Sequence, residues 1–144
     1  MKIFTLLSLI CLQLIFIPSH SLEAKLPEKF DEISEDARKV AAKGKLESTK
    51  DSLVIFAKGL CCMSCAIGAR KMISRLDFVD NDRLNNGVEL DAKTQLIKIA
   101  LKKNAKVDRP GIVKAVDKAG YEAIHTYMLN QKGEILVSAL PKKD

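Results

Sequence analysis

The sequence has no tryptophan, only five phenylalanines and two tyrosines, and only two histidines. With so few aromatic residues it shows no platform on which nucleotide bases would stack. Its basic residues are interleaved with acidic ones along the chain, and the formal net charge of +6 is moderate. We therefore expect no nucleic acid among the partners of this protein.

The start of the chain has the pattern of a secretory signal. A positive residue, Lys2, precedes the apolar run 3–17, and small residues follow at Ser19 and Ser21. A membrane-spanning helix needs ~20 apolar residues, so the run is too short for one. The pattern predicts a cleaved signal peptide over 1–21 and a secreted or periplasmic protein, with an uncleaved anchor as the alternative.

The next segment, 22–51, is dense in charge and predicts a helical linker. Pro27 is expected to open the helix and Gly44 to end it. Its apolar residues recur at spacings of three and four, which predicts one narrow apolar face formed by Phe30, Ile33, Ala37 and Val40. We expect a solvated spacer or a helix lying loosely on the following domain, rather than a helix dedicated to binding a partner.

A compact domain is expected over 52–129. Alternating and β-branched residues predict strands, spacings of three and four predict helices, and Asp108 with Pro110 is suited to begin the second helix. The expected elements are a strand at 52–58, a helix at 66–76, strands at 88–90 and 95–101, a helix after Asp108 that ends at Gly120, and a strand at 121–129. This order predicts an α+β fold of the ferredoxin-like βαββαβ type, an antiparallel sheet with both helices on one face. The segment 130–144 is expected to add a hairpin strand and a tail.

Three of the four cysteines lie together in the segment Gly59-Leu60-Cys61-Cys62-Met63-Ser64-Cys65, and the fourth, Cys11, lies in the predicted signal peptide. Cys62 and Cys65 fall where the first strand meets the first helix. Unpaired backbone N–H groups and the helix dipole favour thiolate there. Two thiolates on a loop suit soft ions, Cu(I) first and Hg(II) second. A CxxC pair alone also fits a redox dithiol or half of a zinc site.

The loop resembles that of the heavy-metal-associated domains found in copper chaperones, in the amino-terminal modules of metal-pumping ATPases and in exported mercury-binding proteins. The loop of that family reads Gly-Met-x-Cys-x-x-Cys, and Leu60 replaces its methionine here. The segment Lys118-Ala119-Gly120-Tyr121 is similar to the family's Ala-Gly-Tyr, which lies close to the metal loop. The resemblance covers about 52–129 and implies that Cys62 and Cys65 are the metal ligands.

Other residues near this pattern keep more than one interpretation. Cys61 is either a third ligand or a spare thiol, and Tyr121 either shields the site or packs in the core. His125 is expected to be a surface or internally satisfied histidine rather than a ligand, and Met63 is expected to face solvent. A disulfide between Cys62 and Cys65 is the structural alternative to a metal site.

These patterns together predict a non-enzymatic, monomeric metal-binding module. It would capture a soft ion and pass it to a membrane metal transporter, such as a P-type ATPase, or to another thiol protein. The rival is a thiol–disulfide oxidoreductase that uses Cys62 and Cys65. The chain lacks the tryptophan that thioredoxin-type enzymes place before their motif, and its prolines offer no evident counterpart of their cis-proline.

Overall fold

The structure is a computed structural model that describes residues 33–142, apart from the side chain of Cys65. The predicted signal peptide at 1–21, the beginning of the predicted linker with Pro27 and Phe30, and the last two residues lie outside the described residues. The described elements are α1 (Glu35–Glu47), β1 (Ser52–Lys58), α2 (Met63–Ile73), β2 (Val88–Asp91), β3 (Leu96–Ala100), α3 (Arg109–Lys118), β4 (Glu122–Leu129) and β5 (Ile135–Ala139).

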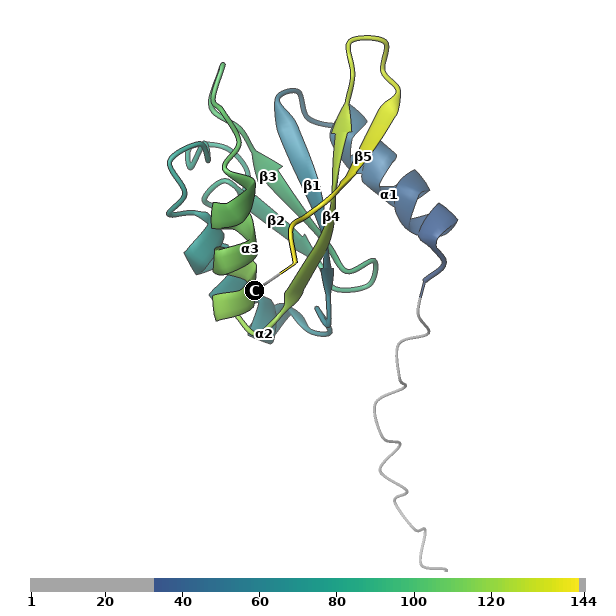
Figure 1. Cartoon of the computed structure of the whole chain (residues 1–144). Coiled ribbons are helices and arrows are strands. Elements are labelled where there is room, and N and C mark those ends of the chain that lie inside the picture. The colour runs from purple at the N-terminus through teal and green to yellow at the C-terminus, as the bar shows by residue number, and fades with distance from the viewer. Residues whose placement is uncertain (1–32, 143–144) are drawn as a thin grey trace, which may run out of the picture.

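The five strands form one sheet in the order β2-β3-β1-β4-β5, and every neighbouring pair is antiparallel. β1 lies in the middle, where Ile55 is paired with Ile97 of β3 on one side and with Thr126 of β4 on the other. α2 and α3 lie side by side against one face, and α1 lies against the other (Figure 1). The predicted α+β class, antiparallel sheet, N-terminal helix and added C-terminal strand are confirmed.

The face under α2 and α3 is built from aliphatic side chains. Leu53, Ile55 and Ala57 alternate along β1 and point to this face, as period-two strand geometry requires. The two helices bring the inner residues Ala66, Ala69, Ile73, Ile112 and Val116, all with no exposed surface. α2 begins three residues earlier than predicted, at Met63. α3 begins where predicted, because the Asp108 carboxylate accepts a hydrogen bond from the Gly111 N–H at 3.1 Å.

The predicted apolar face of α1 is wrong. Val40 is 74% exposed and Ala37 is also exposed, whereas Arg38, Ala42 and Leu46 are buried against the sheet. The physical reason is that the guanidinium of Arg38 lies 3.7 Å from the centre of the Phe56 ring, so that a charged residue takes an inward position. Nor does Gly44 end the helix, which continues to Glu47.

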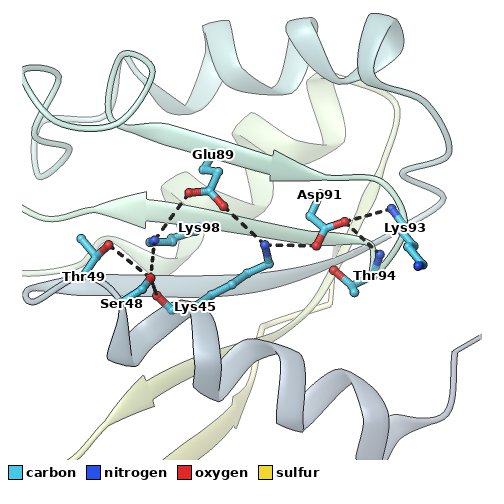
Figure 2. A network of polar contacts seen from close by, with 8 residues as sticks. All are labelled: Lys45, Ser48, Thr49, Glu89, Asp91, Lys93, Thr94 and Lys98. Atoms are coloured by element: carbon cyan, nitrogen blue, oxygen red, sulfur yellow. Dashed lines mark hydrogen bonds and ion pairs between the residues drawn. The ribbon is translucent and has the colours of Figure 1, made fainter.

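Charged side chains join α1 to the sheet (Figure 2). Lys45 of α1 forms ion pairs with Asp91 at 3.0 Å and Glu89 at 3.4 Å. Lys98 of β3 is only 3% exposed, and its ammonium donates to the Ser48 hydroxyl at 3.0 Å and lies 3.5 Å from Glu89. α1 is therefore attached by directed polar contacts as well as by its buried Ala42 and Leu46.

Candidate thiol site

The loop between β1 and α2 is anchored at its beginning. Gly59 adopts φ +89°, a conformation that side chains disfavour, so the chain can turn directly after β1. Leu60 follows with no exposed surface, and its N–H donates to the Ala57 carbonyl at 3.3 Å. Leu60 is thus packed in the core at the position where the resembled loop has methionine.

Cys62 lies where α2 begins. Its carbonyl accepts a hydrogen bond from the Ala66 N–H at 3.1 Å, which is the bond that closes the first helical turn. Cys65 is the third residue of the helix. The first N–H groups of a helix have no partner within it, so this end carries partial positive charge and favours anions. The predicted placement of both cysteines at the strand-to-helix junction is confirmed.

The thiol loop differs in exposure from one residue to the next. Cys61 is exposed and takes part in no disulfide, whereas Cys62 is half-buried. Met63 is 51% exposed, so the prediction that it faces solvent is confirmed. Ile67, one turn further along α2, is 59% exposed. The sequence patterns gave no role to Ile67, although its spacing of four from Met63 would have placed the two side chains together.

A second segment reaches the loop from the end of α3. Gly120 adopts φ +86°, which ends the helix and lets the chain turn into β4. Tyr121 is half-buried against the core, and its ring carbon Cδ1 lies 3.8 Å from the place where a Cβ on Gly59 would be. The expected proximity of the Ala119-Gly120-Tyr121 segment to the loop is therefore found.

His125 lies on the other face of the sheet. Its ring stacks on Phe56 with 6.4 Å between ring centres and meets Tyr127 edge-on at 6.5 Å. Phe56 and Tyr127 belong to the cluster under α1, so the sheet separates these rings from α2. His125 is expected from the sequence to be a surface or internally satisfied histidine rather than a ligand, and the structure shows it in contact with two aromatic rings.

Among the described residues, which do not include the Cys65 side chain, no three or more histidine, cysteine, aspartate or glutamate side chains are grouped so that they could hold a metal ion. A site of the predicted kind would use two sulfurs on one loop and would not form such a group. Within residues 33–142, no helix has both the length and the apolar character needed to cross a membrane.

Comparisons of the chain with protein-family models, with curated proteins and with solved structures find no match in any of the three. The functional argument therefore depends on the chain's own residues and geometry.

Proposed function

We propose that this protein is a soft-metal-binding module in which Cys62 and Cys65 hold Cu(I), or Hg(II) as the second candidate. The observation that carries the proposal is the position of the two cysteines at the beginning of α2, one at the residue that closes the first turn and one inside it. Helix N-termini favour the thiolate form, which is the form that binds metal. Sulfur ligands in turn favour soft ions.

The connectivity of the domain supports the resemblance to heavy-metal-associated domains. Strands β2, β3, β1 and β4, with α2 and α3 on one face, have the order of a ferredoxin-like βαββαβ unit. We propose that the domain at 52–129 has this fold, with α1 and β5 as additions. Tyr121 packs against the core close to Gly59 at the beginning of the loop, which is compatible with either a shielding or a packing role.

Two sulfur ligands on an open loop make release as feasible as capture. A thiolate of an acceptor protein would form a third sulfur bond to the bound ion and displace one of the original cysteines, and a second acceptor ligand would then displace the other. No electron is transferred, and the ion keeps its charge. The half-buried Cys62 favours retention, and the loop's exposed side stays open for the incoming thiol.

The biological setting that we propose is export by a cleaved signal peptide, followed by transfer of the ion to a membrane metal transporter or a P-type ATPase. The protein would act as a monomer. Cys61, which is exposed next to Cys62, serves as a spare thiol in this proposal rather than as an obligatory ligand.

A titration of the reduced protein from residue 22 tests the proposal. Cu(I) is added in the presence of a competing chelator, and Hg(II) is used in parallel. We expect one ion per chain, and at least about a thousandfold weaker binding by the double variant Cys62→Ser, Cys65→Ser, because both soft ligands are lost. The matched control is Cys61→Ser, which we expect to bind within about tenfold of the wild type.

Equal binding by the wild type and the double variant would refute the proposal. The rival function is tested with the same proteins in an insulin-reduction assay. Turnover that requires both Cys62 and Cys65, combined with weak metal binding, would establish a thiol–disulfide oxidoreductase instead.

A further inference from the structure

The fold gathers charge that is dispersed along the sequence. We define the basic layer as residues 63–77 and 102–119, which contain α2, α3 and the segments next to them. The layer has nine basic residues, Arg70, Lys71, Arg75, Lys102, Lys103, Lys106, Arg109, Lys114 and Lys118, and three acidic ones, Asp77, Asp108 and Asp117. The rest of the chain keeps 15 of the 24 basic and 15 of the 18 acidic residues, so it has no net charge. The whole excess of +6 therefore belongs to this layer.

The two helices of the layer lie on one side of the molecule. α2 and α3 cover the same face of the sheet (Figure 1), and the beginning of α3 reaches the end of α2, since a Cβ on Gly111 would lie 3.4 Å from Leu76 Cδ2. All nine basic residues except the half-buried Arg70 are exposed. The ion pairs that join two described residues lie elsewhere, in α1, β2, β3 and the loop at Asp80 and Arg83. Lys102 also donates to the Asp77 carbonyl at 2.8 Å, so the charge that we take to be available to a partner is that of the other exposed cations, which form no ion pair with a described residue.

Two exposed apolar side chains accompany these cations. Met63, Ile67, Lys71 and Arg75 are spaced by four along α2 and its end, so they form one line on the helix surface. Met63 and Ile67 are more than half exposed, and Lys71 and Arg75 are exposed. Apolar side chains beside lysine and arginine fit the boundary between lipid headgroups and acyl chains, where both kinds of side chain find a favourable environment.

We propose that the basic layer binds the surface of an anionic lipid bilayer, with Ile67 and Met63 entering the headgroup region. Each exposed lysine or arginine near such a surface strengthens binding about fivefold. A purely acidic protein partner would account for the cations but not for the exposed Met63 and Ile67, so the lipid surface is the better fit. Docking by this layer places the beginning of α2, with its cysteines, at the membrane.

Sedimentation with vesicles tests this. The reduced, metal-free protein from residue 22 is mixed with vesicles of phosphatidylglycerol and phosphatidylcholine, and with vesicles of phosphatidylcholine alone. We expect binding only to the anionic vesicles, and weaker binding as salt is raised. Replacing Lys71, Arg75 and Lys114 by glutamine should weaken binding about 100-fold, from about fivefold for each charge.

The matched control replaces Lys39, Lys43 and Lys132 by glutamine. These residues lie in α1 and in the β4–β5 turn, and the change in net charge is the same. We expect at most a few-fold loss for this control. Ile67→Ser should weaken binding about tenfold with little dependence on salt, because it removes an inserted apolar group rather than a charge. Circular dichroism spectra of all variants should match that of the wild type, since every replaced side chain is on the surface.

Three results would overturn the proposal. The first is wild-type binding to anionic vesicles no stronger than to neutral ones, and the second is equal loss in the two triple variants. The third is that the wild type is retained on a polyglutamate column but does not bind vesicles. If the basic-layer variant also loses retention on the column, the partner would be an acidic protein surface. The Cys62→Ser, Cys65→Ser variant should bind vesicles like the wild type, so failure of the metal proposal and failure of this one are distinguishable.

Discussion

The two faces of the sheet are stabilised in different ways. The face under α2 and α3 is packed with aliphatic side chains from strands and helices, including Ile55, Ile73 and Ile112, which have no exposed surface. The face under α1 combines Val54, Phe56 and Leu96 with Arg38, Lys98 and the Tyr127 ring, all buried. One helix layer is held mainly by apolar burial, and the other depends also on cations with specific partners.

This difference shows in which helices the spacing of apolar residues correctly identifies the buried side. Aliphatic residues have one favourable environment, so their spacing in α2 and α3 identifies the buried side. Lysine and arginine have long apolar stems that can be buried while the charged end finds a partner. In α1 the buried side includes Arg38, and a pattern of apolar residues alone selected the opposite side.

The largest effect is expected from the aliphatic face. Ile55→Ala should lower the free energy of unfolding by about 3–4 kcal/mol, because a fully buried side chain is replaced by a cavity. Val40→Ala in α1 is the comparison, with an expected change below about 0.5 kcal/mol for a residue that is 74% exposed. Urea unfolding followed by circular dichroism measures both. A large loss of stability in Val40→Ala would show that Val40 is buried, as the sequence predicted, and would contradict the orientation of α1 described above.

A smaller effect is expected from the buried lysine of the other face. Lys98→Ala should cost about 2 kcal/mol, since it removes a packed stem and the hydrogen bond to Ser48. Lys98→Met keeps the stem and should cost less than about 1 kcal/mol, because Glu89 is 45% exposed and keeps its ion pair with Lys45. Equal losses in the two variants would show that the charge, not the stem, dominates.

Arg38 provides a third comparison within α1. Arg38→Ala should destabilise the protein by about 1.5 kcal/mol through loss of its contact with the Phe56 ring and of its hydrogen bond to the Ile33 carbonyl. The outward Lys43→Ala, which removes one exposed ion pair with Glu47, should change stability by less than about 0.5 kcal/mol. Thermal unfolding of the two variants side by side decides whether α1 is held in the orientation described.

The smallest effect concerns acid stability. Burial raises the pKa of Asp91, but hydrogen bonds from Thr94 and the ion pair with Lys45 outweigh it and hold the pKa below its ordinary value. The folded form thus prefers the carboxylate. Its contribution to stability is present above the unfolded pKa, at about pH 4, and is lost as pH falls through the lower folded value.

We expect Asp91→Asn to lose less stability than the wild type between neutral pH and about pH 3. Lys45→Met, which removes the cation opposite Asp91, should reduce the same pH dependence. Thermal unfolding at a series of pH values gives the measurement. An unchanged slope in both variants would show that the network of Figure 2 does not link α1 to β2 in solution.

Much of the fold was predictable because its signals are local. The limits of β1, the Asp108 cap of α3 and the glycine that ends α3, Gly120, follow from residue type and spacing. The early start of α2 was missed although methionine favours a helix, because Ser64 and the cysteines on either side of this pair have lower helix propensity. For the thiol site, the sequence placed Cys62 and Cys65 at the junction, and the structure added the proximity of the Tyr121 ring to Gly59.

The sequence by itself determined the order of the elements, the inner sides of α2 and α3, and the location of the cysteines, because each follows from neighbours a few residues away. Only the tertiary structure decided which side of α1 is buried, that Lys98 lies beneath this helix, and that the net positive charge collects on one layer. Those properties depend on residues far apart in the chain, such as Arg38 with Phe56 or Lys71 with Lys114. Contacts over such separations have no periodic signature, so they become visible only when the sheet and its helices are assembled.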